Sequence, residues 1–254
     1  MTNKMFLLIW LSAFSLTGSF VHAHSLWLNI DNDQPRVGQA VPIEIGWGHK
    51  FPKDEVIKEG FLKEIYACDV TGARTPLKQI SQTVFEFIPQ SEGTFTILAN
   101  VHPGFLSKTT EGYKLQSKKG LENFVSCFRY DIRAKAMVNV GGMAKSPEAP
   151  IGDTLEIVPL KDPRGLDKGE RLPVKIMYQG KPLASADVKA TYAGFSDQPH
   201  TFAWSTATDK TGLAEIKILE KGDWLVNVVH EVPYPQQEEC DQYRYNYSFG
   251  FRVK

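Results

Sequence analysis

Short runs of alternating apolar and polar residues recur along most of the chain, and they constrain the fold more than any other feature. Clear examples lie at residues 25–30, 41–47, 61–69, 83–88 and 93–101. Such runs, bounded by Gly, Pro, Asn and Asp, are typical of β-strands. No long window repeats apolar residues every three and four positions, as an amphipathic helix would. The pattern predicts an all-β protein, and the even spacing of the strands favours β-sandwiches.

Two segments interrupt this pattern. Residues 103–122 are expected to form a long, partly ordered loop, of the kind that is often functional when a rigid scaffold holds it. Residues 145–152, Lys-Ser-Pro-Glu-Ala-Pro-Ile-Gly, have the composition of a linker. We therefore predict an N-terminal β-sandwich over residues 24–144 and a C-terminal Ig-like β-sandwich over residues 150–254.

The second half of the chain carries a characteristic series of turn motifs. Gly-Lys-Pro-Leu at 180–183 is followed by Thr-Asp-Lys-Thr-Gly at 208–212 and Gly-Asp-Trp at 222–224. The second motif fits a turn between strands, in which Gly212 can adopt a positive φ. The series resembles the small Ig-like or transthyretin-like sandwiches that are appended to many exported proteins.

The N-terminus has the three parts of a secretory signal peptide. Lys4 supplies a basic start, residues 5–16 form an apolar run, and the small residue Ala23 precedes the expected cleavage point. The run is shorter than the roughly 20 residues that a membrane span needs, and no later stretch is apolar enough. We expect cleavage after Ala23, which would leave a periplasmic chain that begins at His24 and has no membrane span.

Composition and motifs exclude several classes of function. The 29 basic residues balance the 29 acidic ones, which argues against nucleic-acid binding because that rests on clustered Lys and Arg. The sequence contains no Gly-x-Ser-x-Gly, phosphate-binding Gly-rich loop or His-Glu-x-x-His motif. Acidic pairs such as Asp54 and Glu55 are expected to be solvated loop charges. No catalytic constellation is found, so we do not expect an enzyme.

Histidines at predicted strand ends are the candidates for chemistry. As the first mature residue, His24 would offer its α-amine, with a reference pKa of about 8, and its ring Nδ1 to one metal ion. His49 lies in a Gly-Trp-Gly-His segment, and His230 follows an apolar strand. His102 is a weaker candidate in a turn, and His200 is expected to be only a loop residue. Imidazole suits Zn, Cu, Fe and Ni, but only convergence of several rings would make a site.

The three cysteines would meet an oxidising compartment after export. One disulfide and one remaining thiol is the simplest arrangement for Cys68, Cys127 and Cys240. Spacing alone leaves all three pairings open.

Several segments taken together resemble one family of exported proteins. They lie at residues 23–27, 46–52, 103–112, 155–160, 180–183, 222–226 and 239–243. In this order, along nearly all of the mature chain, they are similar to the family called domain of unknown function 4198. Its members are often labelled NikM-like nickel/cobalt uptake accessory proteins.

The resemblance implies a periplasmic protein that binds Ni²⁺ or Co²⁺ and hands it to a membrane metal-uptake transporter. It places His24, His49 and His230 at the family's recurrent histidine positions, with His102 less characteristic. It also favours a disulfide between Cys127 and Cys240.

Other functions fit the same residues. Donor chemistry does not select nickel, because Cu²⁺ binds nitrogen donors more tightly and Zn²⁺ also accepts them. The chain could thus be a copper-binding periplasmic protein that uses His24, or an oxidase with a copper ion held by the same residue. It could also be a metal-free Ig-like module that binds a glycan or a protein through tryptophans such as Trp27 and Trp47.

Overall fold

The computed structural model describes residues 24–142 and 150–254. The predicted signal peptide, residues 1–23, lies outside the described residues, as do residues 143–149 of the predicted linker and domain boundary. In the part of the chain that is described, no helix is long and apolar enough to cross a membrane.

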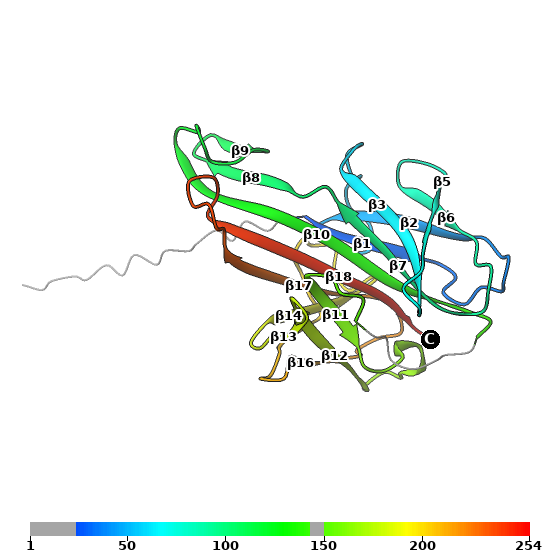
Figure 1. Cartoon of the computed structure of the whole chain (residues 1–254). Helices are drawn as coiled ribbons and strands as arrows, with labels where there is room; N and C mark the ends of the chain where they lie inside the picture. The colour runs from blue at the N-terminus through cyan, green and yellow to red at the C-terminus, as the bar shows by residue number, and fades with distance from the viewer. Residues whose placement is uncertain (1–23, 143–149) are drawn as a thin grey trace, which may run out of the picture.

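The fold is built almost entirely from strands, which confirms the predicted all-β class (Figure 1). One short 3₁₀ turn, η1 (Pro163–Gly165), interrupts them. The strands are β1 (Ser25–Ile30), β2 (Val41–Gly48), β3 (Leu62–Asp69), β4 (Arg74–Pro76), β5 (Lys78–Gln79), β6 (Val84–Phe87), β7 (Gly93–Val101), β8 (Gly104–Thr109), β9 (Gly112–Lys114), β10 (Phe124–Val140), β11 (Leu155–Pro159), β12 (Arg171–Tyr178), β13 (Lys181–Pro182), β14 (Asp187–Tyr192), β15 (Trp204–Ala207), β16 (Leu213–Lys217), β17 (Gly222–Pro233) and β18 (Gln242–Val253).

The strands form three sheets. Sheet A has the order β1-β2-β6-β5, and sheet C has the order β11-β12-β13, with β16 also on β12. Sheet B has the order β15-β14-β17-β18-β10-β7-β3-β4, and the β8–β9 hairpin adds to β10. The contact between β10 and β18 is parallel and joins the two halves of the chain into this one ten-stranded sheet.

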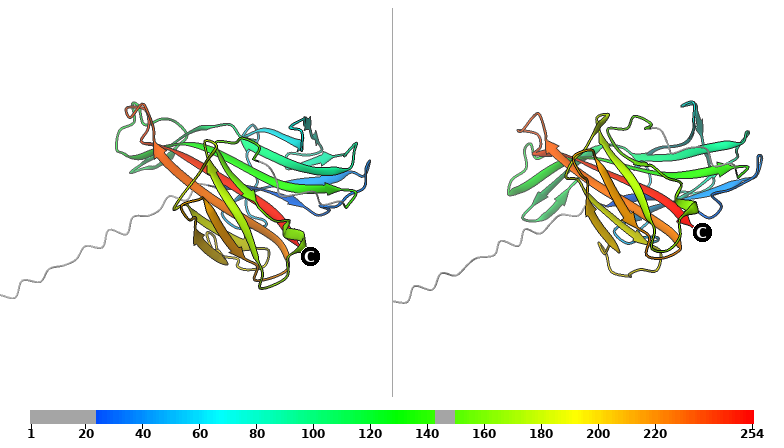
Figure 2. Two further views of the ribbon diagram at one scale, coloured as in Figure 1. Left: turned by 60° about the horizontal axis from the view of Figure 1, so that its bottom comes forward. Right: turned by 90° about the horizontal axis from the view of Figure 1, so that it is seen from below.

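The two faces of sheet B support two separate hydrophobic cores. In β10, Ile132 and Ala134 point into a core shared with sheet A. In β18, Tyr247 and Phe249 point into a core shared with sheet C, which lies below the long strands in Figure 1. Because successive side chains of a strand point to opposite faces, neighbouring residues of β18 belong to different halves of the molecule. The chain thus forms two β-sandwiches that share a sheet, with β17 and β18 running side by side (Figure 2).

Residues 103–122 contain more regular structure than the sequence pattern suggests. Here β8 pairs with the first half of β10, and β9 folds back on β8 through a turn at residues 110–111, which leads into Gly112 with its positive φ. Ser107 and Thr109 are buried by this pairing, and their hydroxyls donate to the backbone carbonyls of Gln116 and Gly112. The expected loop is therefore in part a hairpin. Its strands contain many polar residues, so they lack the apolar alternation that identifies a strand in the sequence.

A disulfide joins Cys127, near the start of β10, to Cys240, just before β18. The two residues are 113 positions apart in the sequence. This confirms the pairing that the family resemblance favoured. Cys68 lies outside the disulfide and is buried in β3.

Candidate metal centre

The pairing of β1 with β2 brings His24 next to His49. In this antiparallel ladder Ser25 lies opposite Gly48, so the residue before Ser25 lies opposite the residue after Gly48. The centroids of the two imidazole rings are 4.2 Å apart. Two of the histidines predicted from the sequence are thus neighbours because of strand register alone.

The turn after β2 adds Glu55 to the pair. Gly48 has a φ of +132°, and a Cβ at this position would lie 2.4 Å from a carboxylate oxygen of Asp54. That carboxylate accepts a hydrogen bond from the backbone N–H of His49 at 2.7 Å. The chain then returns, and the backbone N–H of Glu55 donates to the carbonyl of Trp47 at 3.0 Å. The glycine therefore permits a turn that sets Glu55 beside His24.

The three side chains form a compact set of donors. His24 Nε2 donates to the Glu55 carboxylate and lies 3.1 Å from both of its oxygens. One ligand atom each from His24, His49 and Glu55 can be chosen so that all three lie within 4.8 Å of one another. Donors that share one ion lie about 3 to 4 Å apart, because each bond is about 2 Å long. Two imidazoles and one carboxylate at this spacing fit a transition-metal ion after small side-chain movements.

The position of His24 is fixed from two sides. Its ring stacks on the indole of Trp47, with centroids 5.1 Å apart and planes 6° from parallel. Its backbone carbonyl accepts a hydrogen bond of 3.1 Å from Asn246 Nδ2 in β18. Asn246 is buried, and its own Oδ1 accepts from Asn227 Nδ2 at 2.6 Å. A buried amide pair in the shared sheet thus holds the residue that would become the mature N-terminus.

His200 is a further histidine at this place. Its ring centroid lies 4.3 Å from that of His49, and its backbone N–H donates to the carbonyl of His49 at 3.0 Å. Sequence reasoning placed His200 in an ordinary loop and Glu55 among solvated charges. The signal that could have found Glu55 is its short distance along the chain from His49, across a turn that follows Gly48 and contains Pro52. Nothing in the local sequence points to His200.

His230 and His102 do not join this cluster. His230 lies opposite Tyr245 in the β17–β18 ladder, so its side chain is on the face of Tyr247, whereas Asn246 and His24 are on the other face. The ring packs against Tyr178, with centroids 4.5 Å apart. His102 is exposed after β7. The predicted convergence of three histidines is therefore met by His24 and His49 alone.

Because the His230 ring is partly buried, its pKa differs from that of a histidine in an open site. Desolvation lowers the pKa of His230 below its ordinary value of 6.5, and the nearby Glu231 carboxylate opposes this shift. The neutral ring is thus favoured where it packs against the tyrosine.

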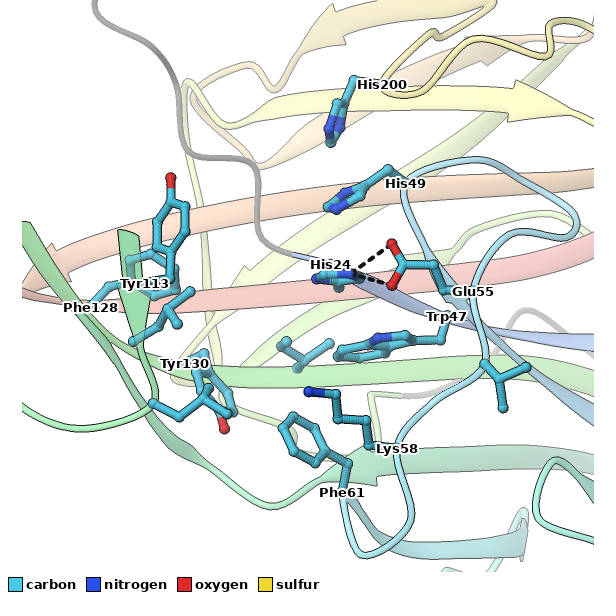
Figure 3. Close-up of a pocket in the computed structure, with 14 residues that line it drawn as sticks. His24, Trp47, His49, Glu55, Lys58, Phe61, Tyr113, Phe128, Tyr130 and His200 are labelled. Carbon is cyan, nitrogen blue, oxygen red and sulfur yellow. Dashed lines mark hydrogen bonds and ion pairs between the residues drawn. The ribbon is translucent and has the colours of Figure 1, made fainter. Parts of the chain in front are cut away.

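A cavity of about 700 Å³ opens beside the donors. Figure 3 shows His24, His49 and Glu55 on one side of it, and Tyr113, Phe128 and Tyr130 on the other. The residues that line it are His24, Trp47, His49, Glu55, Val56, Lys58, Phe61, Leu106, Tyr113, Leu115, Phe128, Tyr130, Ile132 and His200. The candidate metal site therefore forms one wall of a largely apolar cavity.

Solved structures resemble this chain only weakly. The D00-D0 domain of intimin is 11% identical, with 91% of this chain and 100% of that chain covered and a TM-score of 0.22. The fibronectin(III)-like modules of CbhA from Clostridium thermocellum are 9% identical, with 89% and 94% covered and a TM-score of 0.22. A DUF4785 family protein from Legionella pneumophila is 10% identical, with 87% and 54% covered and a TM-score of 0.22. Scores this low carry no argument about function.

Sequence comparison gives a clearer result. No curated protein matches the chain. A family model does match, over residues 21–232, which include β1, β2 and the whole donor cluster. On this match, the chain belongs to the family described as domain of unknown function DUF4198.

Proposed function

We propose that this is a periplasmic protein that binds a divalent transition-metal ion, Ni²⁺ or Co²⁺, and hands it to a membrane uptake transporter. The observation that carries the proposal is the convergence of His24, His49 and Glu55, whose ligand atoms lie within 4.8 Å of one another. His24 and Glu55 are 31 positions apart in the sequence, so the β1–β2 pairing and the following turn bring the donors together.

The donor set suits this class of ion. Imidazole nitrogen favours Ni²⁺, Co²⁺, Cu²⁺ and Zn²⁺ over Mg²⁺ and Ca²⁺, which prefer sites made only of oxygen. Cleavage after Ala23 would add the α-amine of His24 as a further nitrogen donor. In that case the amine and ring Nδ1 would chelate the ion, and Glu55 would orient the ring through Nε2 instead of binding the ion itself. Both arrangements supply three protein donors.

The exposure of the site suits transfer of an ion better than permanent storage. The side chain of Glu55 is 55% exposed and that of His24 is 36% exposed. The donors also face the cavity, so a six-coordinate ion would keep positions open to an incoming ligand. A partner could therefore take the ion without unfolding the site.

Calorimetry on the mature protein that begins at His24 tests the proposal. Ni²⁺ and Co²⁺ should bind, and His49→Ala should weaken binding at least tenfold, because loss of one ligand removes about 1.4 kcal/mol or more. His102→Ala is the matched control, since His102 is exposed and outside the cluster, and it should bind as the parent does. An unchanged affinity in His49→Ala overturns the proposed site.

Copper binding is the second candidate, and the closeness of His24 and His49 favours it, because the amine and both rings would supply three nitrogens. Titration alone cannot separate the two, since Cu²⁺ binds nearly every nitrogen site more tightly than Ni²⁺. The metal found in protein isolated directly from the periplasm decides between them. Nickel or cobalt supports the first proposal, and copper supports the second.

A further inference from the structure

We infer that the ion reaches this site already bound to a small organic chelator, whose apolar or aromatic body fills the cavity beside His24, His49 and Glu55. The inference rests on the proposed function, because it names the form in which the metal is bound. It depends on the size of the cavity, the chemistry of its walls and its charge.

The cavity is much larger than a metal ion needs. A water molecule occupies about 30 Å³ of liquid, so an ion with six waters needs roughly 200 Å³. The cavity measures about 700 Å³. This lies within the range of about 300 to 1,000 Å³ that is typical of sites for small organic molecules.

The wall that faces the donors is apolar and aromatic. Leu106 comes from β8, Tyr113 from β9, and Phe128 and Tyr130 from β10. A hydrated ion gains nothing from such a wall, because apolar groups cannot replace its water ligands. An organic body with rings or alkyl groups gains in proportion to the apolar surface that it buries.

The apolar wall continues to the surface of the molecule. Tyr113 is 52% exposed and Leu115 is 59% exposed, and both line the cavity. A ligand bound in the cavity would cover these two exposed side chains. Both belong to or follow the β8–β9 hairpin, so the hairpin forms the wall that a chelator would touch.

The net charge of the metal-loaded site favours an anionic chelator. A divalent ion beside Glu55 leaves the site with a net charge of about +1, and Lys58 adds a positive charge at the same wall (Figure 3). Among the described residues, no carboxylate forms an ion pair with Lys58. Three protein donors leave three positions on a six-coordinate ion. A carboxylate chelator with three donor atoms and an apolar body fits these conditions.

Two matched nickel complexes test the inference on the mature protein. Ni²⁺–iminodiacetate and Ni²⁺–N-benzyliminodiacetate present the same three donors and differ by one benzyl group. The benzyl complex should bind at least about tenfold more tightly, because the cavity buries the ring. Leu115→Asn should reduce this preference several-fold. Leu160→Asn is the control, because Leu160 is an exposed leucine outside the cavity, and it should keep the full preference.

The outcomes separate this inference from the proposed function. Equal affinity for the two complexes overturns the inference, and binding of Ni²⁺ alone would then leave the proposed function standing. A benzyl preference that survives unchanged in both Leu115→Asn and Tyr113→Ser also overturns the inference, because the ring would then lie elsewhere. If Ni²⁺ binds in no form, the proposed function itself is wrong.

Discussion

The two faces of the shared sheet carry two histidine environments with opposite properties. On one face, His24 lies beside His49 and donates to the Glu55 carboxylate, next to an open cavity. On the other face, His230 packs against Tyr178, and burial lowers its pKa. Both environments are predicted at strand ends from the sequence and look alike there, although β17 continues beyond His230 to Pro233. The difference shows that strand register and face set the neighbours of a histidine, and these neighbours are why we propose only the first environment as a metal site.

Removing one histidine from each environment should give the largest contrast. His49→Ala should weaken Ni²⁺ binding at least tenfold, because it deletes a ligand, whereas His230→Ala should leave the affinity unchanged. Calorimetry on both variants and the parent measures this. Equal losses in the two variants would break the comparison, since His230 would then act on the metal from the opposite face.

Blocking the α-amine tests how His24 binds. One alanine added before His24 in the mature protein should weaken Ni²⁺ binding about tenfold, because it removes the amine from the chelate. Ser25→Thr keeps the hydroxyl that accepts from Asn246 Nδ2, changes no proposed donor and serves as the control. Unchanged affinity in the extended protein would show that His24 binds through its ring alone, with Glu55 as a ligand.

Gly48→Ala should disturb the site through the turn that carries Glu55. The new Cβ would meet the Asp54 carboxylate at 2.4 Å, in a backbone conformation with a φ of +132° that alanine rarely adopts. We expect a loss of about 1 to 3 kcal/mol in the free energy of unfolding and a few-fold weaker Ni²⁺ binding.

Gly152→Ala is the matched control for this turn. It has a φ of +90° with open space around the new Cβ, so it should lose stability through backbone strain while Ni²⁺ affinity stays at the parent value. Denaturant unfolding and calorimetry measure the two effects. If both variants keep full affinity, the turn does not position the donors.

The smallest predicted effect concerns pH on the His230 side. The pKa of His230 in the folded protein is below its ordinary value of 6.5, so the unfolded chain takes up the proton first as the pH falls. Stability should therefore decrease as the pH drops through about 6.5, and the loss should level off below the folded pKa. Glu231 opposes the shift, and Tyr178 packs against the ring.

His230→Phe should remove this part of the pH dependence, while His102→Gln should retain it. Denaturant midpoints measured at about pH 5 and pH 7.5 report the change in stability, because these two pH values lie on either side of the ordinary histidine pKa. A parent protein that gains stability on acidification over this range, relative to His230→Phe, would reverse the predicted sign.

The sequence predicts local structure well, because period-two alternation is a property of each strand by itself. Residues 25–30 and 93–101 form strands at the predicted positions. The parallel contact between β10 and β18 is different, since it joins segments more than 100 positions apart, as the pairing of Phe128 with Gln242 shows. No local pattern encodes that contact, so the sequence suggested two separate sandwiches and gave no sign of the shared sheet.

The candidate site was predictable only in part for the same reason. His24 and His49 stood out because of the expected cleavage point and the neighbouring glycines. The face of His230 depends on its register against Tyr245, which a sequence does not show. Glu55 and His200 are brought in by a turn and by a long-range backbone contact, so their residue types alone could not reveal a role.

X-ray absorption spectroscopy of the Ni²⁺-loaded mature protein tests the central claim most directly, because it reports the ligands around the ion. We predict scattering from two imidazole rings in the parent protein and in His230→Ala, and from one ring in His49→Ala. A nickel ion that shows no imidazole ligands, or whose spectrum is identical in the parent and His49→Ala, would contradict the account.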